Sequence, residues 1–60
     1  MPVVTIEWWE GHPTEQKEKL ITGITKAFLD IGLKAEELYV IIHDVPKTNW
    51  GLAGKQASKR

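Results

Sequence analysis

The sequence predicts an α/β protein built from a single βαβ unit whose two strands are parallel. Three observations predict this fold: alternating apolar residues over 3–9, an amphipathic helical pattern over 14–31, and a second apolar run over 38–45. A helix of this length between two strands allows the right-handed crossover that parallel strands require. Sixty residues are too few for a second domain, so residues 1–60 are expected to form one protomer.

The first strand is expected at Val3–Trp9, because this segment is rich in β-branched and aromatic residues. Alternation places Val4, Ile6 and Trp8 on one face and the other residues of the segment on the opposite face. On this pattern Trp8 is expected in the core. The strand is followed by Gly11, which permits a tight turn.

The helix is expected to begin at or just after Pro13, because a proline at the first helical position loses no hydrogen bond that the helix would make. Thr14 is the competing capping residue. Apolar residues then recur at steps of one, three and four: Leu20, Ile21, Ile24, Ala27, Phe28 and Ile31. Gly32 follows the last of them and fits a left-handed terminator, so the helix is expected to span about 14 to 31.

The second strand is expected at 38–45, after a short turn at 34–37. Its centre is apolar on successive residues, which indicates burial on both faces. Pro46 cannot donate a hydrogen bond to a strand ladder and is expected to end it. The segment 49–54 contains Trp50 and two glycines, and we expect it to form a small hairpin.

Self-association is expected because so small a chain buries only about 60% of the surface that its unfolded form exposes. The sequence has no cysteine for a disulfide, and its two histidines, His12 and His43, are too few and too far apart for a structural metal site. A two-stranded sheet with one face covered is not stable by itself. Its other face is therefore expected to meet another copy of the chain.

The charge pattern disfavours nucleic acid and membranes as partners. Basic and acidic residues number 8 each, and the basic ones are scattered along the chain. The longest purely apolar stretch, 38–42, is far shorter than the roughly 18 residues that a membrane span needs. We expect a soluble, cytoplasmic protein.

The candidate catalytic group is Pro2. Initiator methionine is removed when the next residue is small, so processing would leave Pro2 with a free secondary amine. An α-amino group titrates at about 7.7–8.0, and an apolar pocket would lower the pKa further, which suits a general base at neutral pH. Because a Met-Pro start also occurs by chance, this feature alone does not establish catalysis.

Several short motifs follow one another along nearly the whole chain: Met1-Pro2, Ile6, Glu10-Gly11, Glu15-Gln16-Lys17-Glu18, Leu20-Ile21, Val40-Ile41-Ile42, Lys47, Trp50-Gly51, Gly54 and Ala57-Ser58-Lys59. Their order and spacing, with about one deletion near Gly32, resemble the 4-oxalocrotonate tautomerase family of the tautomerase superfamily. The resemblance implies a βαβ protomer with a C-terminal hairpin that assembles as a homohexamer, a trimer of dimers. It also implies that Pro2 acts as general base and then general acid, without metal or organic cofactor.

Two positions depart from the family pattern. The family holds substrate oxygens with two arginines, and those positions fall at His12 and Tyr39, whereas the only arginine here is Arg60 at the chain end. A protonated imidazole and a phenol hydroxyl can still donate to oxygen, so both residues are candidates for substrate binding, against the alternative that both are surface residues. Trp50 falls where the family has a phenylalanine that lines the active site. It is the third candidate for substrate binding, with interface packing as the alternative.

Two classes of function stay open on the sequence. The leading hypothesis is a cofactor-independent keto–enol tautomerase acting on a small enol or 2-hydroxydienoate of a 2-oxo acid, with sites formed between subunits. The alternative is a non-catalytic oligomeric module that binds a small ligand and retains the tautomerase fold. A retained Met1 would favour this alternative, because it would acylate the Pro2 nitrogen. Hydrolytic dehalogenation ranks lower, since it requires arginines that the chain lacks.

Overall fold

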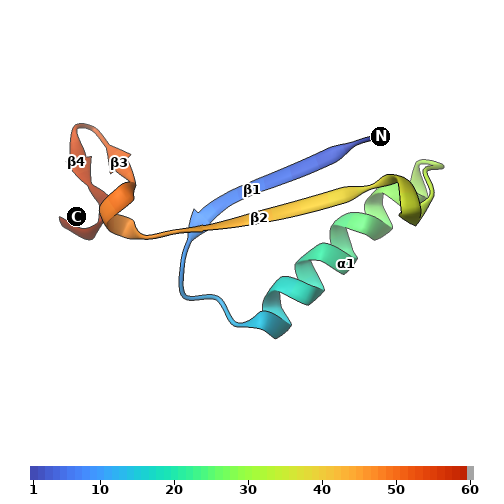
Figure 1. The fold of residues 1–60 in the computed structure, drawn as a ribbon, viewed down its shortest axis with the longest axis horizontal. Coiled ribbons are helices and arrows are strands. Elements are labelled where there is room, and N and C mark those ends of the chain that lie inside the picture. The colour runs from blue at the N-terminus through green and yellow to red at the C-terminus, as the bar shows by residue number, and fades with distance from the viewer. Residues whose placement is uncertain (60) are drawn as a thin grey trace.

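The computed structural model describes residues 1–59, which fold as a βαβ unit followed by a small hairpin (Figure 1). The βαβ unit consists of β1 (Val3–Trp9), α1 (Thr14–Asp30) and β2 (Tyr39–Val45). The antiparallel hairpin consists of β3 (Gly51–Leu52) and β4 (Lys55–Gln56), and 3-10 turns occupy Ala35–Glu37, Lys47–Asn49 and Ala57–Lys59. The predicted fold of the single chain is confirmed, and its hexameric assembly stays a prediction.

The two long strands are parallel, with Val3 opposite Tyr39 and Trp9 opposite Val45. α1 runs along one face of this sheet (Figure 1). Side chains alternate between the two faces, and those toward the helix are half-buried: Val4, Ile6, Trp8, Val40 and Ile42. The alternation predicted for the first strand is confirmed. Trp8 lies on the predicted face of the sheet, the one toward α1. The expectation that it is a core residue is wrong, because its side chain is only half-buried.

The end of α1 differs from the prediction by one residue. Ile31 caps the helix with non-helical dihedral angles and is 72% exposed, so it does not belong to the apolar stripe. Gly32 has a positive φ of 101°, and the N–H groups of Gly32 and Leu33 donate to carbonyls of the last helical turn. This is the Schellman arrangement, so the left-handed terminator predicted at Gly32 is confirmed.

The starts of α1 and β2 lie close to their predicted positions. Pro13 has an extended backbone and its carbonyl accepts hydrogen bonds from the N–H groups of Gln16 and Lys17, so Thr14 begins the helix and does not cap it. β2 begins at Tyr39, one residue later than predicted, because Leu38 ends the 3-10 turn that precedes it.

The described chain has no enclosed core. None of the side chains in residues 1–59 is fully buried, and the face of the sheet opposite α1 is open. Ile41 on that face is 43% exposed, so burial on both faces of β2, which its sequence predicts, is absent in the single chain. The radius of gyration is 14.5 Å, against about 10 Å for a compact domain of this length. The single chain is elongated and leaves its hydrophobic side chains uncovered.

No helix within residues 1–59 is both long enough and apolar enough to cross a membrane.

Candidate active site

Pro2 lies directly before β1 and is half-buried. Its carbonyl accepts a hydrogen bond of 3.1 Å from the backbone N–H of Tyr39, the first residue of β2. The parallel register produces this contact, because it brings the amino-terminal ends of both strands to the same edge. Met1 is 83% exposed, and its removal would convert the Pro2 nitrogen from an amide into a secondary amine.

Tyr39 lies on the open face of the sheet, with a side chain that is 54% exposed. Its backbone is held by the hydrogen bond to Pro2, so the start of its side chain is fixed beside the candidate base. The structure therefore brings together two of the four predicted site residues, Pro2 and Tyr39. The phenol of Tyr39 is a hydrogen-bond donor on this open face of the sheet.

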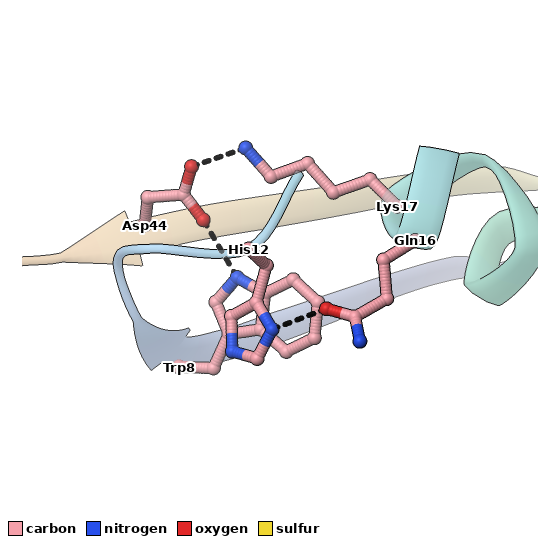
Figure 2. Close-up of polar contacts among 5 residues, drawn as sticks. All are labelled: Trp8, His12, Gln16, Lys17 and Asp44. Atoms are coloured by element: carbon pink, nitrogen blue, oxygen red, sulfur yellow. Dashed lines mark hydrogen bonds and ion pairs between the residues drawn. The ribbon is translucent and has the colours of Figure 1, made fainter. Parts of the chain in front are cut away.

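His12 lies beyond the other end of β1, in a polar cluster at the start of α1 (Figure 2). Gly11, with φ of 114°, turns the chain back, and the His12 ring stacks on the Trp8 indole with centroids 3.8 Å apart and planes 14° apart. His12 Nδ1 lies 2.5 Å from Gln16 Oε1, so Nδ1–H donates to that oxygen. Trp8 of β1 therefore covers one face of the ring, and Gln16 of α1 holds one edge of it.

Asp44 ties this cluster to β2. The Trp8 indole N–H donates to Asp44 Oδ1 at 2.6 Å, and the Lys17 ammonium group forms an ion pair with Oδ2 (Figure 2). The hydrogen bonds from Lys17, and then from Trp8, hold the pKa of the Asp44 carboxyl below its usual range. Asp44 is therefore ionised at neutral pH and joins the start of α1 to the ends of both strands.

Trp50 lies just before β3, in contact with the end of β1. Its ring meets Trp9 edge to face, with centroids 5.9 Å apart and planes at 76°, and the Lys47 ammonium nitrogen lies 4.6 Å from the centroid of the Trp9 ring. This arrangement is a cation–π contact beside an aromatic pair. An apolar wall with a positive charge at its edge suits a small organic anion.

The four predicted residues do not form one site within a single chain. β1 has seven residues, and each adds about 3.3 Å, so Pro2 and Tyr39 are roughly 20 Å from His12 and Trp50. Residues 1–59 of one chain enclose no pocket, and they contain no group of three or more histidine, aspartate or glutamate residues that could hold a metal ion. Arg60, the only arginine, lies outside the described residues.

The sequence did not indicate the residues around His12. The sequence pattern predicts Trp8 in the core, and it does not mark Gln16 or Asp44 as candidate site residues. The contact with Asp44 depends on the register of the two strands, which sets Val3 opposite Tyr39 and Trp8 opposite Asp44. A second strand that starts at 38, as the sequence predicts, would instead place His43 opposite Trp8. The stacking of the His12 ring depends on the turn at Gly11, and no spacing in the sequence indicates it.

The family model described as tautomerase enzyme matches residues 2–60. The chain belongs to the tautomerase family. This tautomerase is 42% identical over 60 residues to 2-hydroxymuconate tautomerase of Comamonas testosteroni, covering 98% of this chain and 95% of the relative. It is 36% identical over 59 residues to 2-hydroxymuconate tautomerase of Bacillus subtilis strain 168, covering 97% and 95%.

Solved structures agree with this assignment. A 4-oxalocrotonate tautomerase isozyme from Methylibium petroleiphilum superposes with a TM-score of 0.85 at 41% identity, covering 95% of this tautomerase and 94% of that chain. A heterohexamer 4-oxalocrotonate tautomerase from Chloroflexus aurantiacus J-10-fl gives a TM-score of 0.86 at 30% identity, covering 98% and 97%. The predicted family and the tautomerase function are confirmed, so the protein is an isomerase. The relatives favour this reading over a non-catalytic binding module.

Proposed function

We propose that this tautomerase converts a small enol or 2-hydroxydienoate into the conjugated 2-oxo acid, with Pro2 as the proton carrier after Met1 is removed. The proposal rests above all on the position of Pro2, half-buried at the start of β1 and in contact with Tyr39. The family match begins at this same residue. Two relatives are named 2-hydroxymuconate tautomerase, and 2-hydroxymuconate is a 2-hydroxydienoate.

The proposed reaction is an internal proton transfer. The neutral amine of Pro2 takes the proton of the 2-hydroxyl group, the electron pair of that O–H bond forms the carbonyl, and the double bonds shift along the chain. The resulting ammonium then returns its proton to a carbon α or γ to the carbonyl. Atoms and charge balance between substrate and product, so the reaction requires no metal and no organic cofactor.

The proposed site combines residues of different copies. Pro2 and Tyr39 of one chain would meet His12 and Trp50 of others, since these pairs lie roughly 20 Å apart in one chain. Tyr39 and His12 would donate to substrate oxygens, and Trp50 would form an apolar wall that disfavours the charged form of the amine. The uncovered sheet face and the elongated shape support a homo-oligomer of this single 1–60 protomer, and the hexamer named for a relative suggests six copies.

We propose the cytoplasm as its location, a prediction that rests on the sequence alone.

The proposal is tested by replacing the proline. Pro2→Ala keeps a small second residue and hence the removal of Met1, but gives a primary amine of different basicity and shape. We expect the rate on enolised 2-oxo acids to fall by about 10²- to 10⁴-fold, the usual contribution of a positioned acid–base group. Intact mass must show that Met1 is absent, and Pro46→Ala serves as a matched control with unchanged activity. A Pro2→Ala enzyme with wild-type rates would refute the mechanism.

A further inference from the structure

The His12 ring is held in one orientation by contacts on its face and on one edge. Trp8 covers a face of the imidazole at a centroid distance of 3.8 Å, and Gln16 Oε1 accepts a hydrogen bond from Nδ1 at 2.5 Å (Figure 2). Stacking restrains the plane of the ring, and the hydrogen bond restrains its rotation within that plane. Within the described residues no hydrogen bond engages Nε2.

This arrangement decides what Nε2 can do in each ionisation state. In the neutral ring the single proton is on Nδ1, where Gln16 accepts it, so Nε2 carries a lone pair and repels a carboxylate. In the protonated ring Nδ1–H still donates to Gln16, and Nε2 becomes a charged N–H donor. The same edge therefore changes from repelling an anion to binding one when a single proton is added.

The groups around His12 come from three elements, β1, β2 and α1. From β1, Trp8 offers the face of an indole, which attracts a cation. From β2, Asp44 accepts the indole N–H and is negatively charged; from α1, Lys17 is positive and offsets part of that charge through its ion pair with Asp44. Because the pKa of Asp44 lies below its usual range, Asp44 keeps its charge near neutral pH.

We propose that His12 is a carboxylate receptor gated by its own protonation, and that Gln16 and Trp8 are its positioning residues. The ligand class, a small organic acid such as a 2-oxo acid, rests on the proposed function. Where an always-charged arginine would bind the acid at any pH, this site binds it only below the titration midpoint of His12. Each pH unit above that midpoint leaves about a tenth of the competent form and weakens binding about tenfold.

The test follows the ring directly, so that it does not depend on turnover. Long-range ¹H–¹⁵N spectra of the full-length, methionine-free protein report the tautomer and titration of each imidazole, and His43→Gln assigns the two signals. Sodium benzoate is the anionic probe, and benzamide is the neutral probe of the same shape. We expect the neutral His12 ring to carry its proton on Nδ1, and the benzoate affinity to fall about tenfold per pH unit above the midpoint, while benzamide binding stays constant.

Gln16→Glu sharpens the test, because a carboxylate beside Nδ1 favours the protonated ring and moves the His12 midpoint to higher pH. The pH dependence of benzoate binding must move by the same amount. Thr22→Glu, which adds the same charge at an exposed position further along α1, is the matched control and is expected to move neither. Three results would overturn the proposal. The neutral ring could carry its proton on Nε2, or the benzoate affinity could stay constant across the His12 titration. The third is that Gln16→Glu moves the His12 midpoint without moving the pH dependence of benzoate binding by the same amount. Repeating the measurement on Pro2→Ala separates it from the proposed catalysis, since benzoate binding must persist without the proline.

Discussion

The open face of the sheet gives the sharpest prediction about assembly. Ile41 points away from α1 and is 43% exposed. Burying a whole isoleucine side chain stabilises by about 1.5–3 kcal/mol, so covering the exposed part of Ile41 is worth roughly 1 kcal/mol per copy. Val3, Trp9 and Tyr39 on the same face are between 42% and 54% exposed, and the four together offer roughly 3–6 kcal/mol per copy.

The substitution Ile41→Asp is expected to dissociate the assembly. It removes the contribution of Ile41 and forces a carboxylate without a partner into an apolar contact, which costs several kcal/mol. This cost is as large as the whole contribution of the open face. Because one chain has no enclosed core, dissociated chains are also expected to lose most of their far-UV circular dichroism signal at 25 °C.

Sedimentation velocity over a range of protein concentrations measures the outcome. The control is Ile31→Asp, the same change at a residue that is 72% exposed and lies after α1, where the oligomer is expected to persist. If Ile41→Asp sediments as the wild-type species at every concentration, or if the wild-type protein is a folded monomer, then the open face is not an assembly surface and the reasoning is wrong.

Two further predictions concern stability, measured by urea unfolding at fixed protein concentration. Gly32→Ala is expected to cost about 1–2 kcal/mol, because alanine must adopt the positive φ of 101°. Gly23→Ala inside α1 is expected to stabilise by about 0.5–1 kcal/mol, because beyond its chain neighbours and the helix backbone no atom lies within 4 Å of the added methyl. Equal effects of the two substitutions would contradict this explanation. Lys17→Met and Trp8→Phe are each expected to raise the pKa of Asp44, followed by carboxyl NMR, with Lys17→Met giving the larger rise. Because the pKa of Asp44 is lowered in the folded protein, ionised Asp44 stabilises the fold above the ordinary aspartate pKa of about 3.9. This stabilisation is lost as pH falls through the folded pKa. Both variants should therefore be less stable than the wild type at pH 7 and approach its stability in acid.

Most of the fold could be predicted because its signals are local. The alternation in Val3–Trp9 gives the bounds of β1 as the structure has them, and Gly32 marks the turn that ends α1. The predicted helix included Ile31 because an apolar residue at the right spacing extends the periodic pattern, although the chain has already left the helix there. Periodicity reports which residues are apolar, and the terminal hydrogen bonds decide where the helix stops.

The candidate site was less predictable because the contacts between its residues depend on strand pairing and on the turns between elements. The contact between Pro2 and Tyr39 follows from the parallel pairing of the strands, which the βαβ pattern already implies. The stacking of His12 on Trp8 depends on backbone angles at Gly11 that no residue pattern specifies. The expected meeting of Pro2 with Trp50 involves separate copies, so it stays a prediction.

The length of the strands also has a genetic consequence. If Pro2 of one chain shares a site with Trp50 of another, a mutation of Trp50 impairs the site that contains the neighbour's Pro2, whereas a mutation of Pro2 removes the amine of its own chain. Two defective chains with different lesions could then rescue each other by co-assembling. After gene duplication, one gene product could retain Pro2 and the other could retain Trp50. The two chains would then share one site without any change of fold.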